Sequence, residues 1–133
     1  MKPLIGAICS IAVLTLSQVA AAAKLAYRCE VQHVYALTDD GSLDASGFGK
    51  TMKGSKFSVS RVTGEITGEV VPTLMAASTH VINRGSTENS FKAVANFGGQ
   101  VQVLEVQEFK QSHAKPFVAM SMGGAGIVTG KCK

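Results

Sequence analysis

The sequence predicts an all-β fold, a small antiparallel meander of about eight strands whose first and last strands are joined by a disulfide. Three observations lead to this prediction. Apolar and polar residues alternate with a period of two after residue 24, the connections are short and rich in Gly, Ser and Asp, and Cys29 and Cys132 stand near opposite ends. A closed barrel is preferred over a two-sheet sandwich, because an even meander brings its first and last strands side by side.

The segment before this pattern, residues 1–23, has the features of a secretory signal peptide. It starts with a lysine, continues through an uncharged apolar run at residues 4–16, and ends in four alanines that suit a cleavage site. The uncharged run is shorter than the roughly 20 residues that a membrane-spanning helix needs. We expect cleavage after Ala23, or after one of the two alanines before it, and no transmembrane segment in the mature protein.

The remaining residues, 24–133, fit a single β-rich domain. Once Cys9 is removed with the signal, this domain keeps the even pair Cys29 and Cys132, which predicts a disulfide in an exported chain. Such a bond closes almost the whole domain into one loop, and is worth about 4–5 kcal/mol in the chain-entropy model. The short alanine-terminated signal favours the periplasm, with full secretion as the alternative.

The charge pattern is weak. The chain has 13 Lys and Arg against 9 Asp and Glu, a formal net charge of +4, and its only local basic cluster is Lys50, Lys53 and Lys56. This mild positive balance favours weak attraction to anionic envelope surfaces, and it gives no basis for nucleic acid as a partner.

The first strand is expected to begin at Leu25 and end at Leu37. Its odd-numbered positions are mostly apolar, so Cys29, His33 and Tyr35 are expected on the buried face. The turn residues Asp-Asp-Gly-Ser follow, and residues 41–55 are predicted to form a surface loop.

A hairpin is predicted around Thr63-Gly64. If these two residues form the turn, Phe57 pairs with Val70 and Val59 pairs with Gly68, which puts apolar residues on one face.

Five further strand segments and one irregularity are expected in the second half. Between residues 100 and 109 the apolar positions change face, which predicts a β-bulge near Val103-Leu104. The strands are expected at residues 80–84, 90–97, 100–109, 116–122 and 127–132.

No pattern of catalytic or cofactor-binding residues is complete. Gly49-Lys50-Thr51 lacks the earlier glycine of a phosphate-binding loop, and residues 39–44 lack the alternating oxygens of a calcium loop. The histidines His33, His80 and His113 are too dispersed in sequence for a zinc motif. We therefore expect no cofactor, no metal and no enzymatic activity. A hydrolase or isomerase whose site is built from scattered residues is a further hypothesis, after the two functions described next.

The function predicted is that of an exported, non-enzymatic binding or interaction protein of the cell envelope, with a protein or another envelope component as its partner. Polar loops on a rigid β scaffold are the expected binding surface. The candidate ligand-binding residues are Tyr35, Lys50, Lys53 and His33. The alternative is an inhibitor of a secreted or wall-lytic enzyme, which would insert the loop at residues 41–55 or 123–126 into a substrate cleft.

Overall fold

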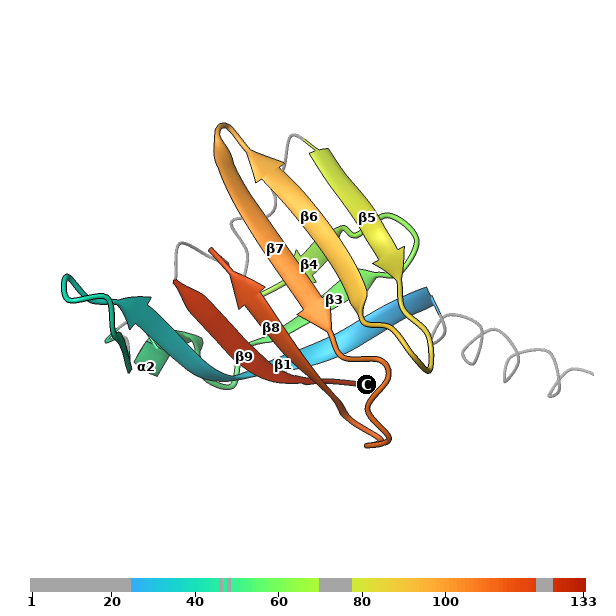
Figure 1. Ribbon diagram of the computed structural model, residues 1–133, viewed down its shortest axis with the longest axis horizontal. Helices are drawn as coiled ribbons and strands as arrows, with labels where there is room; N and C mark the ends of the chain where they lie inside the picture. The colour runs from blue at the N-terminus through green and yellow to red at the C-terminus, as the bar shows by residue number, and fades with distance from the viewer. Residues whose placement is uncertain (1–24, 46, 48, 70–77, 122–125) are drawn as a thin grey trace, which may run out of the picture.

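The computed structural model describes residues 25–45, 47, 49–69, 78–121 and 126–133, so the expected signal peptide lies outside the described residues. These residues form one antiparallel sheet with a short helix beside it (Figure 1). The elements are β1 (Ala26–Leu37), β2 (Leu43–Ala45), α2 (Gly49–Met52), β3 (Lys56–Ser60), β4 (Ile66–Gly68), β5 (Ser78–Arg84), β6 (Phe91–Phe97), β7 (Gln100–Val106), β8 (Lys115–Met120) and β9 (Ile127–Cys132).

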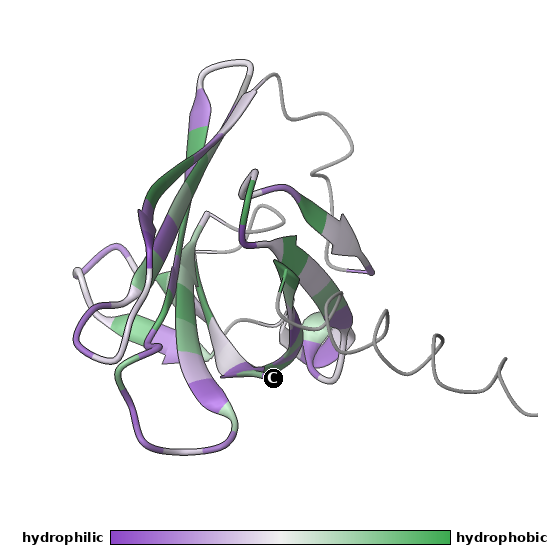
Figure 2. Ribbon diagram, turned by 90° about the vertical axis from the view of Figure 1, so that its right-hand side faces the viewer, coloured by the Kyte–Doolittle hydropathy of each residue, from purple (hydrophilic) through white to green (hydrophobic). Residues whose placement is uncertain are grey.

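The sheet curls around its own apolar face. Its strand order is β4-β3-β1-β9-β8-β7-β6-β5, with β2 attached to the far end of β1. The curl, seen in Figure 2, brings side chains from distant strands into contact: the rings of Tyr27 and Phe91 are 5.1 Å apart, and those of Phe57 and Phe117 are 5.3 Å apart. The core is therefore built from the inward residues of both halves of one sheet.

The first and last strands pair as predicted, and the disulfide is confirmed. Cys29 lies directly opposite Cys132 in the β1–β9 ladder, and the two sulfur atoms are bonded across a sequence separation of 103 residues. Beside them Arg28 and Lys133 exchange two backbone hydrogen bonds of 2.9 and 2.8 Å. The chain ends of the domain are thus fixed to each other by both covalent and hydrogen bonds.

The predicted closed barrel is not confirmed, because the described residues form an open half-barrel. The sheet ends at β4 and β5, and no pairing between these two strands is seen in the described residues. The turn between β3 and β4 lies in the gap instead. A Cβ on Gly64 would be 3.1 Å from the Ala93 Cβ and 3.4 Å from Val81 Cγ2, so this turn packs on β5 and β6 through van der Waals contact rather than a ladder.

The predicted bulge in β7 is wrong, and a bulge occurs in β1 instead. β6 and β7 pair without interruption, whereas the β1–β9 register shifts between Val31 and His33. In β7 the apolar phase changes because Gln102 takes an inward position, where it is only 3% exposed and its Nε2 has no hydrogen-bond partner among the described residues. A second register shift lies in the edge strand β5.

Gly130 makes room for the β1 bulge. It lies opposite Val31, and a Cβ at this position would overlap the carbonyl oxygen of Glu30 and would lie 2.7 Å from the ring of Phe117. Only a residue without a side chain fits between the bulged backbone and the aromatic core.

The β3–β4 hairpin forms with a longer loop than predicted. Phe57 pairs with Gly68 and Val59 with Ile66, so the register is displaced by two residues from the expected one. The Ser60 hydroxyl accepts hydrogen bonds from the backbone N–H groups of Val62 and Thr63, and this favours a loop of residues 61–64 over a two-residue turn. A displacement of two keeps the apolar residues on the same face.

Candidate functional site

The outer face of β1 is the candidate binding surface. In its first half Tyr27, Cys29 and Val31 point inward and are at most 4% exposed, which leaves Arg28 and Glu30 on the outside. A strand places successive side chains on opposite faces, so the bulge after Val31 reverses which residues are exposed beyond it.

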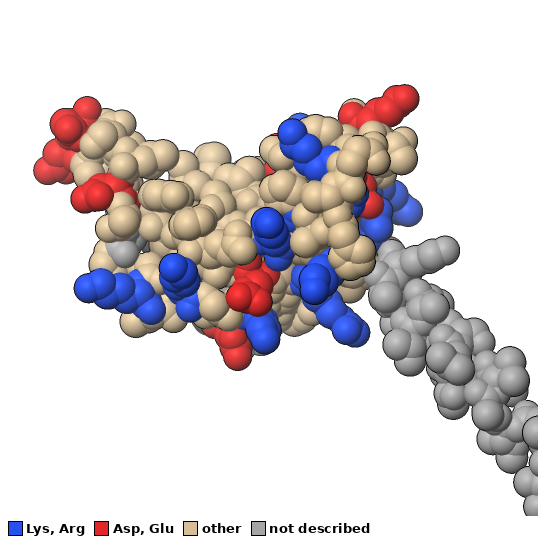
Figure 3. All heavy atoms as spheres, turned by 90° about the horizontal axis from the view of Figure 1, so that it is seen from below, with Lys and Arg blue, Asp and Glu red and all other residues tan. Residues whose placement is uncertain are grey.

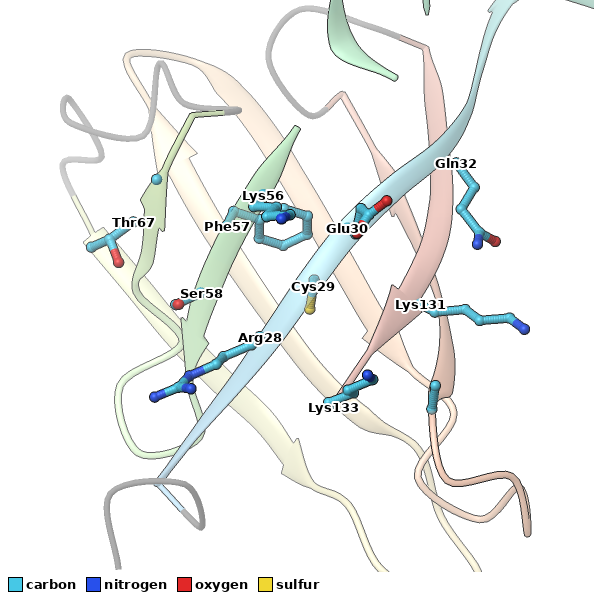
Figure 4. Close-up of a pocket in the computed structure, with 12 residues that line it drawn as sticks. Arg28, Cys29, Glu30, Gln32, Lys56, Phe57, Ser58, Thr67, Lys131 and Lys133 are labelled. Carbon is cyan, nitrogen blue, oxygen red and sulfur yellow. The ribbon is translucent and has the colours of Figure 1, made fainter. Parts of the chain in front are cut away.

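A groove of about 610 Å³ lies over this first half of β1 (Figure 4). Most of its lining residues are outward-facing members of four neighbouring strands, and the β7–β8 loop adds one more. They are Arg28, Cys29, Glu30, Gln32, Lys56, Phe57, Ser58, Thr67, Gly68, Ala114, Lys131 and Lys133. We call this feature the basic groove, because four of its residues are cationic and one is anionic.

The four cations of the basic groove, Arg28, Lys56, Lys131 and Lys133, are all exposed. Glu30 is placed between Lys56 of β3 and Lys131 of β9 by the two ladders, yet no ion pair involving these five residues is found in the described part of the chain. Figure 4 shows Arg28 and Lys131 extending to opposite sides of β1. The groove therefore presents an excess of positive charge that the protein itself does not neutralise.

The candidate residues predicted from sequence all lie elsewhere, on a projecting arm. We define the arm as residues 33–45 together with α2 and the adjoining Lys53; Met52 of α2 is buried and belongs to the same apolar cluster as Val34. A Cβ on Gly49 would be 3.1 Å from the Val34 Cβ, so α2 and β1 are in close contact. Figure 1 shows this arm extending away from the curled sheet.

His33 is not on the buried face where it was predicted. The β1 bulge turns His33 outward and puts Val34, which is 5% exposed, into the core in its place. His33 stacks on half-buried Tyr35 with ring centroids 6.2 Å apart. These two residues are separated from exposed Lys50 and Lys53, since α2 covers the opposite side of the strand.

The tip of the arm combines acidic and apolar side chains. Asp39, Asp40 and Asp44 are exposed, and Leu37 pairs directly with Leu43, with exposed fractions of 70% and 53%. An exposed cross-strand leucine pair at the end of a hairpin adds little to a core, and marks a surface that can contact a partner.

Asp40 organises this tip rather than a metal site. Its Oδ1 accepts hydrogen bonds from the hydroxyl groups of Thr38 and Ser42 at 2.5 and 2.8 Å, and from the backbone N–H of Ser42 at 3.1 Å. These bonds, that from Thr38 first, lower the pKa of the Asp40 carboxyl to about 2. Among the described residues, no three His, Cys, Asp or Glu side chains are grouped closely enough to hold a metal ion.

A second polar cluster joins three parts of the sheet near the open seam. The Tyr27 hydroxyl donates a hydrogen bond of 2.6 Å to Glu108 Oε2, while Arg61 lies 3.6 Å from Glu108 Oε1 and 4.7 Å from the Tyr27 ring centroid. Burial, and then the Glu108 hydrogen bond, raise the pKa of Tyr27 above its ordinary value. The cluster connects β1, the β3–β4 loop and the β7–β8 loop, so its evident role is structural.

The basic groove was missed from sequence, although the signals were present. Arg28 lies on the polar side of the first strand, and Lys131 and Lys133 flank Cys132 in the last. Because the disulfide was predicted to join these strands, the same pairing implied that their outward cations would be neighbours. The contribution of Lys56 needed the observed β1–β3 register.

No helix among the described residues is long and apolar enough to cross a membrane. The buried disulfide is consistent with an exported, non-cytoplasmic protein.

No protein-family model, curated protein or solved structure matches the chain.

Proposed function

We propose that the protein is an exported, non-enzymatic interaction protein of the cell envelope, with the periplasm as its preferred location, and that it binds an acidic partner in the basic groove. The observation that supports this most directly is the set of four exposed cations on the disulfide-linked strands β1 and β9 and on the adjacent strand β3. The ladders of the sheet fix the backbones of these cations close together, so no change of backbone is needed to gather positive charge around an anionic group.

The shape of the site favours a chain-like or compact acidic group over a flat surface. The cations surround a hollow of about 610 Å³ and come from β1, β3 and β9. Lysine and arginine stems can line such a hollow while their charged ends reach the ligand. An acidic protein segment is both narrow enough to enter the hollow and negatively charged.

A binding experiment with labelled poly-glutamate tests this proposal. We expect salt-dependent binding that is weakened at least tenfold in K131Q/K133Q, measured by fluorescence anisotropy, because two of the four groove cations are removed. The control is K50Q/K53Q, which changes the net charge equally on the arm. Equal loss in both variants would mean that only total charge matters, and would refute the groove as the site.

Inhibition of a secreted or wall-lytic enzyme is the second candidate, and the arm favours it. The arm extends from the sheet, is supported by α2, and carries exposed Leu37 and Leu43 at its tip. A rigid projecting hairpin can occupy a substrate cleft with little loss of conformational entropy. In assays against wall-lytic hydrolases, L37S/L43S should abolish inhibition while K131Q/K133Q keeps it; no inhibition by the unmodified protein would eliminate this candidate.

A further inference from the structure

The molecule carries two exposed surfaces of opposite charge. The arm tip has Asp39, Asp40 and Asp44, while the basic groove has four cations around Glu30. Figure 3 shows acidic side chains gathered at the tip of the projecting end, and lysine and arginine side chains on the underside of that end and over the body, where further acidic side chains also lie. Surfaces of this kind attract each other when they belong to separate molecules.

The arm cannot reach the groove of its own chain. Both lie on β1, with Glu30 in the groove and Leu37 at the base of the tip. At about 3.3 Å per residue these two positions are about 23 Å apart along one strand. Between them β9 pairs with Val31, His33 and Tyr35 on either side of the bulge, so the strand cannot fold back on itself.

We propose that the arm tip of one copy docks in the basic groove of a second copy. This inference names a partner for the groove, and so rests on the proposed function. The ligand chemistry is that of an acidic β-turn: Asp39 and Asp44 present carboxylates to the cations, while the Asp40 carboxylate is held in the turn by Thr38 and Ser42.

The leucine pair gives the contact an apolar component. Leu37 and Leu43 are exposed large apolar residues of the hairpin, and they lie beside the three aspartates. In the docked arrangement they pack against the aliphatic stems of the groove lysines, which removes apolar surface from water. Charge thus orients the arm, and apolar contact holds it.

Each copy offers one arm and one groove, so the contact is heterologous. Successive copies then join head to tail, and the assembly grows unless its geometry closes into a ring. A symmetric dimer, in which each of two copies places its arm tip in the groove of the other, is the smallest closed form, whereas contact of tip with tip or of groove with groove is opposed by like charges.

Sedimentation of the oxidised protein at high micromolar concentration and low salt tests this contact. D39N/D44N removes two arm charges, and K131Q/K133Q removes two groove charges. In the described structure none of these four side chains is hydrogen-bonded to another side chain, and Asp44 Oδ1 accepts a hydrogen bond from the backbone N–H of Ala45. We expect the unmodified protein to associate reversibly in a salt-dependent way, and each variant alone to stay monomeric.

The decisive sample is an equimolar mixture of the two variants. One intact arm and one intact groove then remain, so the mixture should form dimers and nothing larger. Association of K131Q/K133Q alone would indicate contact through the leucines and overturn the inference, as would a monomeric unmodified protein or a mixture that stays monomeric.

Poly-glutamate binding separates failure of this inference from failure of the proposed function. If the unmodified protein is monomeric but binds poly-glutamate in a K131Q/K133Q-sensitive way, the second copy is excluded and the acidic-partner site stands. If binding is also absent, both fail. When the inference is correct, poly-glutamate competes with the arm and dissociates the assemblies.

Discussion

The two halves of β1 differ in how they are stabilised. Before the bulge, the strand is paired with β3 and β9, and its inward residues are at most 4% exposed. Beyond it, the strand leads to a hairpin whose terminal leucine is 70% exposed and whose turn is held by side chains of Thr38, Asp40 and Ser42. Long-range contacts stabilise the first half, whereas local hydrogen bonds shape the end of the second, which leaves the arm tip available for a partner.

The largest effect is expected at the disulfide, which anchors the first half. C29A/C132A should lower the free energy of unfolding by about 4 kcal/mol, because the 103-residue separation is no longer closed in the unfolded chain. Urea denaturation measures this loss. Reduced unmodified protein should show a comparable destabilisation, and a loss below about 1 kcal/mol would show that the ladder alone holds the two strands.

The next largest effect is expected at Gly130, where the two halves meet. G130A should destabilise the protein by about 1–3 kcal/mol, since its Cβ overlaps the Glu30 carbonyl and the Phe117 ring. Thermal unfolding measures the change, with G47A as the control because a Cβ there has nothing within 4 Å. Equal stability of the two variants would contradict the tight approach at the bulge.

A smaller effect is expected at Tyr27. Y27F should cost about 1–2 kcal/mol by removing the hydrogen bond to Glu108, whereas Y35F on the arm should cost less. The pKa of Tyr27 is raised in the folded protein, so its stabilising contribution is complete below its ordinary value near 10 and is lost as the pH rises toward the folded value. The difference in unfolding free energy between Y27F and the unmodified protein should therefore shrink above pH 10.

The smallest effect on overall stability is expected at Asp40. D40N should leave global unfolding unchanged and should increase amide exchange at Ser42, whose N–H donates to this carboxylate. The folded pKa of about 2 lies below the ordinary value of 3.8, so the turn's contribution is present above pH 4 and is lost as the pH falls through about 2. D39N is the control. Equal amide exchange at Ser42 in the two variants would mean that backbone hydrogen bonds, and not the Asp40 carboxylate, stabilise the turn.

The same comparison explains how far the sequence could predict the fold. Alternation of apolar residues located the longer strands, but β2 and α2 lie in residues 41–55, which were predicted to be a loop. The cysteine pair identified the neighbouring first and last strands correctly. The position of the bulge could not be read locally, because it depends on Gly130 approaching β1 from another strand. The bulge predicted in β7 is wrong for a related reason, because the polar side chain of Gln102 occupies an inward position that the period of two assigns to an apolar residue.

The candidate site was predicted less well than the fold. His33 and Tyr35 do lie together, but outside the core, and Lys50 and Lys53 lie across the strand from them. Arg28 and Lys131 form no local motif, and they become neighbours only through the ladder between β1 and β9, so they could be found from the sequence only by way of the predicted disulfide pairing. Tests of the arm and of the groove are therefore tests of surfaces that only the folded sheet assembles.

The burial of the disulfide has a consequence for its chemistry. Cys29 is 3% exposed and Cys132 is fully covered, so a thiol reagent has very little access to either sulfur while the sheet is intact. Cleavage of the bond must wait for an opening of the β1–β9 ladder, and the rate of reduction by excess dithiothreitol then reports how often that ladder opens. We therefore expect the disulfide to survive a short exposure to reductant in the folded protein, and to be reduced when the strands around it open.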